Sequence, residues 1–179
     1  MSGARLADVL DFWFARGWED WWKADPAFDL EVKERFLTLW EELREKVPEH
    51  FLGSADEALA AILLFDQLPR NMFRGHADQF MTDSLALAIA KGAIDRGYDD
   101  GMTPERRGFL YMPFEHSEDL RDQRQSLLLF TALGDAQMVG YARKHHDVIE
   151  RFGRFPHRND MLGRKPTALE AAAGKVVPW

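Results

Sequence analysis

The sequence of 179 residues contains no cysteine. Without a thiol, the chain cannot form a disulfide scaffold, an iron–sulfur cluster or a cysteine-ligated zinc site, and it has no cysteine nucleophile. Long apolar runs are also missing. The longest wholly apolar run, residues 58–65, is far shorter than the roughly 20 residues that a membrane-spanning helix needs. Asp8 and Asp11 interrupt the N-terminal apolar stretch, so we expect no signal peptide, no membrane partner and a cytoplasmic location.

An excess of positive charge is also missing, because 30 Asp and Glu outnumber 23 Lys and Arg and the net charge is −7. An acidic protein lacks the basic field that binding to nucleic acid or to an anionic membrane requires, so we predict no nucleic-acid partner. The charge is unevenly distributed. Residues 140–179 contain eight Lys or Arg against four Asp or Glu, a net of +4, whereas residues 1–139 carry −11. The basic C-terminal part is therefore where we look for an anionic ligand.

The hydrophobic residues, 46% of the chain, recur with the period of a helix. Leu6, Val9, Leu10, Trp13 and Phe14 form one apolar stripe of this kind, and no alternating pattern long enough for a strand is present. Seven or eight such segments are joined by short turns, with no linker between them. The sequence predicts a single all-α domain over residues 1–179, with helices packed as antiparallel hairpins.

Capping residues, prolines and glycines indicate the helix boundaries. Predicted helix starts are Asp25–Pro26, Ser54 with Glu57, Thr103–Pro104, Ser117, Asp135 and Thr167 with Glu170. Predicted helix ends are Gly17, Pro48, Pro69, Gly97, Pro113, Gly134 and Gly153. One further helix is expected from about His76 towards Arg96.

The first polar cluster is residues 66–71, Asp-Gln-Leu-Pro-Arg-Asn, with Arg74. It follows a predicted helix end, where the helix dipole disfavours an anion, so Asp66 needs a compensating partner. One interpretation is a guanidinium pair, Arg70 and Arg74, that binds an anionic ligand. The alternative is that Asp66 and Arg70 form an ion pair that holds the turn after Pro69.

The second polar cluster, residues 113–118, contains His116 beside Glu115 and Glu118. A carboxylate next to a histidine fixes the tautomer of the ring and raises its basicity, as a general base or a metal ligand requires. Helix capping is the simpler alternative. Ser117 would then be the N-cap, with Glu118 in the first turn.

The third polar cluster, residues 145–159 with Gly163 and Arg164, is the richest. His145 is expected on a buried helix stripe, with His146 pointing elsewhere. The cluster contains four arginines, more than the dipole of one helix end can hold: Arg151, Arg154, Arg158 and Arg164. They need carboxylates from the acidic part of the chain or an anion from outside.

These segments resemble a bacterial family, number 924 in the domain-of-unknown-function series. The matching segments are residues 10–14, 65–71 with 74–75, 111–118, and 151–159 with 162–164. The resemblance implies a tetratricopeptide-like stack of helical hairpins, and it brings no activity, substrate or cofactor. The positions that fall on the family motif are Asp66, Gln67, Arg70, Asn71, Arg74, Asp83, His116, Ser117, Glu118, Gln123, His145, Arg151, Arg154, His157, Arg158, Asn159 and Arg164.

The leading hypothesis is that the three clusters form one pocket for a small anionic or phosphorylated ligand. The predicted ligand-binding residues are Asp66, Gln67, Arg70, Asn71, Arg74, Arg151, Arg154, His157, Arg158, Asn159 and Arg164. If chemistry takes place, His116, Glu118 and His145 are the candidate catalytic residues, with Glu118 or Asp66 orienting the histidines. The hypothesis assigns no cofactor and no metal.

Three alternatives stay open. The first is a metal-dependent hydrolase that uses residues among His116, Glu118, His145, His146, Asp147 and His157. The second is a helical interaction module with a peptide or protein partner, for which Trp18, Trp21 and Trp22 are the candidate anchors because Trp13 and Trp40 fall on core stripes. The third is an internal network of ion pairs that fixes how the helices meet.

Overall fold

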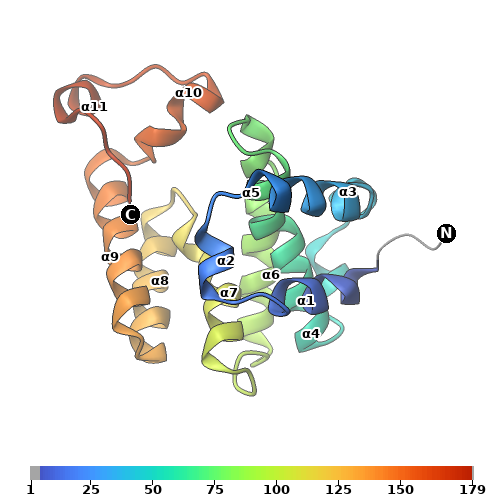
Figure 1. Ribbon diagram of the computed structural model, residues 1–179. Helices are drawn as coiled ribbons and strands as arrows, with labels where there is room; N and C mark the ends of the chain where they lie inside the picture. The colour runs from blue at the N-terminus through green and yellow to red at the C-terminus, as the bar shows by residue number, and fades with distance from the viewer. Residues whose placement is uncertain (1–4, 179) are drawn as a thin grey trace. The chain divides into compact units, whose positions relative to one another are not determined.

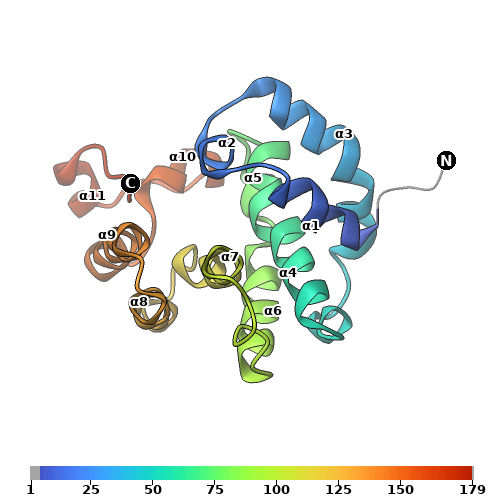
Figure 2. The same ribbon diagram turned by 60° about the horizontal axis from the view of Figure 1, so that its bottom comes forward.

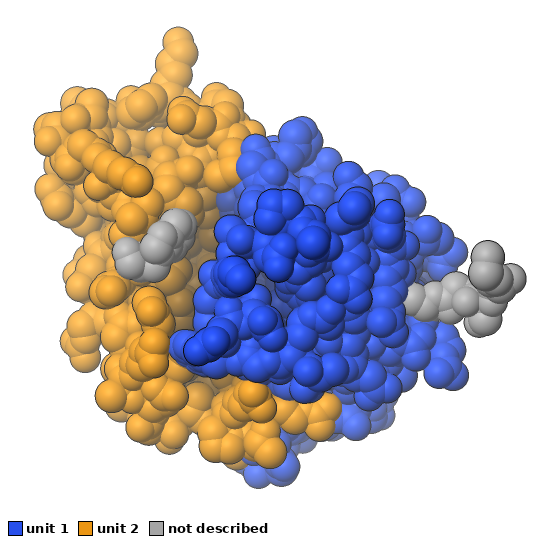
Figure 3. All heavy atoms as spheres, viewed as in Figure 1, with its two compact units in different colours: residues 1–102 blue, residues 103–179 orange. Residues whose placement is uncertain are grey.

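The computed structural model of the protein describes residues 5–178, and within them it contains helices and turns but no β-strand. The prediction of an all-α fold is confirmed. The chain divides into two compact units, residues 1–102 and residues 103–179, which Figure 1 shows as ribbons and Figure 3 in two colours. A single domain over the whole chain stays a prediction.

In unit 1, residues 1–102, helices from the beginning of the unit pack against helices that follow later in the chain. Its helices are α1 (Leu6–Phe14), α2 (Trp18–Trp22), α3 (Pro26–Leu43), α4 (Ala55–Ile62), α5 (Leu68–Met72) and α6 (Asp83–Asp95). Helix α1 packs on α4, α4 on α6, and α3 on α5, as Figure 2 also shows. Trp13 and Trp40 are buried, which confirms their predicted place in the core.

Two predicted helix starts in unit 1 are confirmed. The Asp25 carboxylate accepts hydrogen bonds from the first amides of α3, and the Ser54 hydroxyl accepts one from the Glu57 N–H at the start of α4. Two boundaries differ from the prediction. Helix α3 ends at Leu43, five residues before Pro48, and Val47, which directly precedes the proline, is extended, as expected at that position. Helix α6 begins at Asp83, and a short 3-10 turn takes the place of its expected first turns.

The prediction that Pro69 closes a helix is wrong. Helix α4 continues through a π-helical turn, Leu63–Gln67, directly into α5, in which Pro69 is the second residue. Because proline has no N–H, the Phe65 carbonyl, four residues earlier, lacks the donor that it would have in an α-helix. The Thr82 hydroxyl donates to that carbonyl at 2.7 Å and accepts from Trp40 Nε1 at 3.1 Å. A side chain from outside the helix thus replaces the missing donor.

Unit 2, residues 103–179, is built on three neighbouring helices. They are α7 (Pro104–Glu115), α8 (Leu120–Leu133) and α9 (Ala136–Phe152), followed by the short helices α10 (Asn159–Leu162) and α11 (Ala168–Ala173). Helix α8 packs against both α7 and α9, and Figure 2 looks nearly along all three axes. Among the described residues, the helices of six or more residues are α1, α3, α4, α6, α7, α8, α9 and α11, in line with the predicted seven or eight.

The turn between α8 and α9 is as the sequence predicts. Gly134 has a positive φ of 82°, the left-handed conformation that ends a helix, and the Asp135 carboxylate accepts hydrogen bonds from the first amides of α9. Gly153 ends α9 in the same conformation. Thr167 and Glu170 form the predicted capping box of α11.

The junction between α7 and α8 differs from the prediction in two ways. Pro113 lies inside α7, which continues to Glu115 instead of stopping at the proline. The N-cap of α8 is Asp119, whose carboxylate accepts from the Arg121 N–H, rather than Ser117. The Ser117 hydroxyl instead accepts from the Asp119 N–H and donates to Asp122.

Candidate functional site

The first polar cluster lies in unit 1, and its arginines are paired with carboxylates. Two nitrogens of Arg70 donate to the two carboxylate oxygens of Asp83 at 2.8 and 2.9 Å, and a third contact of 3.6 Å joins Arg70 to the buried Asp66. Arg70 also donates to the Asp66 carbonyl. Burial of the guanidinium favours its neutral form, but the Asp83 and Asp66 carboxylates outweigh this effect and raise the pKa of Arg70.

Arg74 and Asn71 share one partner, Asp29 on α3. Arg74 donates to the two oxygens of Asp29 at 2.6 and 2.8 Å, and Asn71 donates at 2.8 Å. Burial alone would raise the pKa of Asp29, but these hydrogen bonds outweigh burial and lower it. Both arginines therefore have carboxylate partners within unit 1. The ion-pair alternative in the sequence analysis named Asp66 and Arg70, and the shorter contact of Arg70 is with Asp83. Ligand binding at this cluster stays a prediction.

The second and third polar clusters both lie in unit 2, and an ion pair joins them. Arg164 donates to both carboxylate oxygens of Glu118, at 2.8 and 3.0 Å, and the backbone N–H of Phe155 donates to Glu118 at 2.7 Å. Burial favours the neutral form of Glu118, but the hydrogen bonds from Arg164 and Phe155 outweigh it and lower the pKa of Glu118. Residues 46 positions apart in the sequence are thereby held together.

Arg164 is also the centre of a network that holds the C-terminal segment. It donates to Asn159 Oδ1 at 2.9 Å and to the Phe155 carbonyl at 3.1 Å. Asn159 in turn donates to the buried Glu170 of α11, which also lies 3.5 Å from Arg154. The geometry therefore directly supports a structural role for Arg154, Asn159 and Arg164, which hold this segment in place.

A second group of side chains surrounds the ring of Phe155, which is fully buried. The Arg158 guanidinium lies 4.5 Å from the centre of this ring, and the rings of His145 and His157 lie 5.6 and 5.7 Å from it. His116 joins the group, because Arg158 donates to its carbonyl at 3.0 Å and its ring lies 6.3 Å from that of His145. We call His116, His145, Phe155, His157 and Arg158 the Phe155 cluster.

The carboxylate in contact with His145 is Glu115, which the sequence analysis did not select. His145 is buried on α9, as predicted, and its Nδ1 lies 3.0 Å from Glu115 Oε1. Glu118, the predicted orienting residue, instead binds Arg164 and Phe155. The signal that could have pointed to Glu115 is its position directly after the apolar residues 109–114, with which it is buried at the end of α7.

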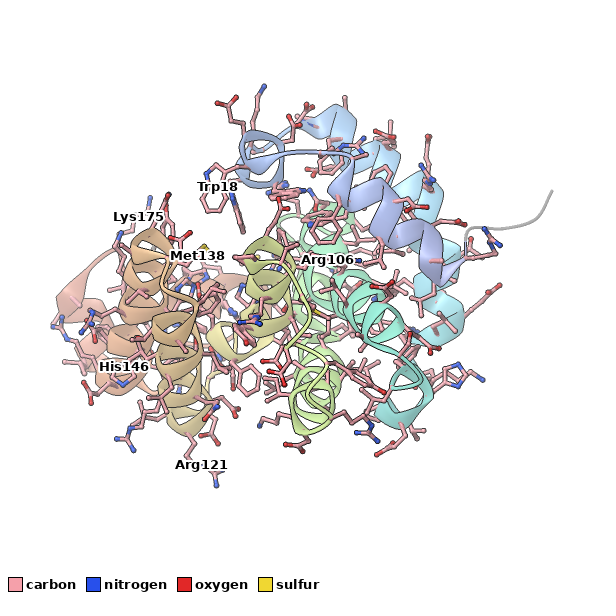
Figure 4. All side chains as sticks on the ribbon, turned by 90° about the horizontal axis from the view of Figure 1, so that it is seen from below. Trp18, Arg106, Arg121, Met138, His146 and Lys175 are labelled. Atoms are coloured by element: carbon pink, nitrogen blue, oxygen red, sulfur yellow. The ribbon has the colours of Figure 1, made fainter. Side chains whose placement is uncertain are left out.

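The remaining candidates of unit 2 lie on the outer part of α9. Arg151 is exposed, with its guanidinium 4.9 Å from the Phe152 ring. His146 Nδ1 lies 3.2 Å from Asp147, and with Glu150 these residues offer ligand atoms that all lie within 4.8 Å of one another. Figure 4 labels His146 on this helix.

The candidate tryptophan anchors lie in unit 1 and separate into two kinds. Trp21 is buried, stacks on Trp13 and donates to the Trp13 carbonyl at 3.0 Å. Trp18 and Trp22 are 43% and 46% exposed and pack edge to face with each other. Figure 4 labels Trp18 on α2. Two of the three predicted anchors are thus at the surface.

Comparison with known proteins gives two findings. The family model described as "Bacterial protein of unknown function (DUF924)" matches residues 9–173. The chain belongs to this family. A solved structure of a protein of unknown function from Agrobacterium tumefaciens is also similar, with 39% sequence identity and a TM-score of 0.88 over 94% of this chain and 95% of that one. A search of curated proteins gives no match.

Membership in the DUF924 family confirms the resemblance found in the sequence. The tetratricopeptide-like relationship and the shared pocket of all three clusters stay predictions. In the described part of the chain, no helix is both long and apolar enough to cross a membrane.

Proposed function

We propose that unit 2 binds a small anionic ligand, with a phosphate or carboxylate group, at the Phe155 cluster. The observation that supports this proposal is that three imidazoles and one guanidinium gather in one cluster: His145, His157 and Arg158 lie against the buried Phe155 ring, and His116 lies against His145. Guanidinium and protonated imidazole groups are the side chains best suited to hold phosphate or carboxylate oxygens. The net charge of +4 over residues 140–179 favours an anion in the same region.

The Phe155 cluster is also held in place, as a binding site requires. Arg158 is fixed by its hydrogen bond to the His116 carbonyl and by the ring beneath it. The N–H and C=O of Phe155 itself are bound by Glu118 and Arg164. A site whose groups are fixed before the ligand arrives loses less conformational entropy on binding. In this proposal His116 and His145 are also the acid and base groups, and Glu118 and Arg164 hold the loop that carries Arg158.

The test is binding of inorganic phosphate. The melting temperature of the protein in phosphate is compared with its melting temperature in sodium chloride of equal ionic strength. We expect wild-type protein to be stabilised, because a ligand that binds only the folded state raises its stability. Arg158→Gln should lose most of this response. Arg121→Gln is the matched control, since Arg121 lies at the start of α8, is highly exposed and points away from the helix (Figure 4).

Two results would contradict the anion site. One is a wild-type response to phosphate no larger than the response to chloride, and the other is an Arg158→Gln response equal to that of Arg121→Gln. If Arg158→Gln does not fold, the imidazole resonances of His116 and His145 in wild-type protein give the answer. They should shift as phosphate is added, and constant resonances would also contradict the proposal.

A metal-dependent hydrolase is the second candidate, and the cluster of His146, Asp147 and Glu150 favours it. One imidazole and two carboxylates are a ligand set that zinc and manganese accept. We expect untagged protein to bind about one zinc ion per chain with His146 present, and His146→Ala to lose it. His50→Ala, an exposed histidine in unit 1, is the control. Equal zinc binding by both variants would exclude this site.

Two further predictions accompany the proposal. The exposed pair of Trp18 and Trp22 is the part of the chain suited to a peptide or protein partner. A cytoplasmic location is expected from the sequence, as before.

A further inference from the structure

One of the buried carboxylates in the described part of the chain differs from the others in its cationic partner. Asp66 and Glu170 lie 3.6 and 3.5 Å from an arginine nitrogen, whereas Glu115 lies 3.0 Å from the imidazole of His145. Arginine keeps its charge throughout the physiological pH range, while imidazole can gain and lose a proton there. Glu115 is therefore the buried carboxylate whose partner is able to transfer a proton.

The contacts of His145 determine which ring nitrogen carries the proton. Its Nδ1 lies 3.0 Å from Glu115 Oε1 and 2.9 Å from the Tyr141 carbonyl. Both neighbours are hydrogen-bond acceptors, so Nδ1 carries the hydrogen in the neutral ring and Nε2 keeps its lone pair. The Tyr141 carbonyl alone is enough to set this tautomer. What the Glu115 carboxylate adds is a negative charge beside the ring when Nε2 takes up a second proton.

The backbone that carries the Glu115 side chain is held by a residue of α8. The side-chain amide of Gln123, fully buried on α8, donates to the carbonyls of Glu115 and Ser117 at 2.7 and 2.6 Å. These bonds satisfy carbonyls at the C-terminal end of α7, which have no partner within the helix. The second oxygen of Glu115 is buried without a hydrogen-bond partner, so the contact of Oε1 with His145 is the polar contact that the structure gives this carboxylate.

We propose that Glu115 is the positioning residue of His145, which acts as a proton-transferring imidazole in the anion site of unit 2. The substrate class is then a small anion that also carries a transferable O–H or N–H proton. His145 Nε2 takes that proton, the electron pair of the broken bond stays on the substrate, and Glu115 stabilises the imidazolium until the proton is returned. This inference rests on the proposed anion site, because a proton-transferring group needs a bound ligand beside it.

A purely structural role for the same pair would be to hold α7 against α9. Both roles lower stability when Glu115 is replaced, so loss of stability does not distinguish them. The response of the ring to an added anion does, because a merely structural pair leaves the His145 resonances unchanged as phosphate is added, whereas a proton-transferring imidazole in the anion site must shift. The control for Glu115 is Glu105, an exposed glutamate in the first turn of α7. Glu105→Gln removes the same charge from the same helix without contact with His145.

The experiment is nitrogen and proton NMR of protein labelled with 15N-histidine, with the His145 signals assigned by a His145→Gln variant. In wild-type protein we expect the neutral ring to carry its proton on Nδ1, with a low-field N–H resonance, because hydrogen bonds to charged groups are short and polarised. Glu115→Gln should shift this resonance upfield, and Glu105→Gln should leave it in place. Glu115→Asp, which keeps the charge, should restore part of the low-field shift.

Two results would overturn the inference. They are a neutral wild-type ring protonated on Nε2, and a low-field resonance that is the same in Glu115→Gln as in wild-type protein. The first result needs only wild-type protein and the His145→Gln assignment, so it decides the question even if Glu115→Gln does not fold. A phosphate titration of the same variants distinguishes failure of this inference from failure of the proposed anion site. Arg158→Gln should lose phosphate binding and keep the low-field position of the resonance, whereas Glu115→Gln should shift the resonance upfield and bind phosphate within about threefold of wild type.

Discussion

One hydroxyl, that of Thr82, joins three segments of unit 1. It donates to the Phe65 carbonyl and accepts from the Trp40 indole N–H, and all of these groups are buried. Thr82→Val keeps the shape of the side chain but leaves a buried donor and a buried acceptor without partners. Because each such group costs roughly 1–3 kcal/mol, we expect the free energy of unfolding to fall by about 2 kcal/mol or more.

Urea unfolding at neutral pH measures this effect, and Thr82→Ser is the matched control. Serine loses a methyl group but keeps the hydroxyl, so it should be clearly more stable than the valine variant. Equal stability of the two variants would show that the hydroxyl does not replace the missing donor at Phe65.

Single residues also show where sequence reasoning reached its limit. The spacing of apolar residues on α9 correctly places His145 on a buried stripe, because helical periodicity is a local property. The partner of His145 could not be found in the same way. Glu115 directly precedes His116 and Glu118 follows it by two residues, so both lie close to it in the sequence. Only the direction of each side chain decides which of the two contacts His145. That direction depends on which helix packs opposite, which is a tertiary property.

At the scale of helices, two glycines of the same helix should respond in opposite ways to alanine. Gly153 ends α9 with a φ of 69°, whereas Gly140 lies within α9 and a Cβ added there would meet open space. A side chain disfavours the left-handed conformation by about 1–2 kcal/mol, so Gly153→Ala should destabilise unit 2 by about 1 kcal/mol. Gly140→Ala should stabilise it by roughly 0.5–1 kcal/mol, because alanine favours helix. Thermal unfolding of both variants is the measurement, and effects of the same sign would contradict the expectation.

The helix ends show why some boundaries were predictable and others not. Asp25, Asp135, Gly134 and Thr167 act on amides or carbonyls within a few residues, so their roles can be recognised in the sequence. Proline is different, since its cost depends on whether another group takes over the missing hydrogen bond. For Pro69 that group comes from Thr82, 17 residues from the carbonyl it serves, and no local pattern reveals it.

At the scale of the whole molecule, acid should weaken both units through paired carboxylates. The pKa values of Glu118 in unit 2 and Asp29 in unit 1 are lower in the folded protein than the usual 4.5 and 3.8. Such a group stabilises the folded state fully above its usual pKa and loses this contribution as the pH falls through the lower, folded value. We therefore expect stability to drop as the pH is lowered below about 4.5.

Glu118→Gln separates this effect from general acid unfolding. The difference in unfolding free energy between wild type and Glu118→Gln, measured with urea, should shrink between about pH 5 and pH 3. Asp29→Asn should behave likewise for unit 1. A difference that stays constant or grows on acidification would contradict the lowered pKa of the carboxylate concerned.

The long sequence separation of the Glu118–Arg164 pair also has a consequence for the order in which unit 2 folds. Helices α8 and α9 are joined by a tight turn and can pair early, whereas this ion pair must close a loop between residues 46 positions apart. The Phe155 amide, bound to Glu118, reports that closure. Pulsed hydrogen exchange during refolding should find it protected later than the amides of α8 and α9, and simultaneous protection would refute this order. The histidines and Arg158 would then meet only at the final stage of refolding, so a chain arrested before that stage would be helical but would lack the proposed anion site.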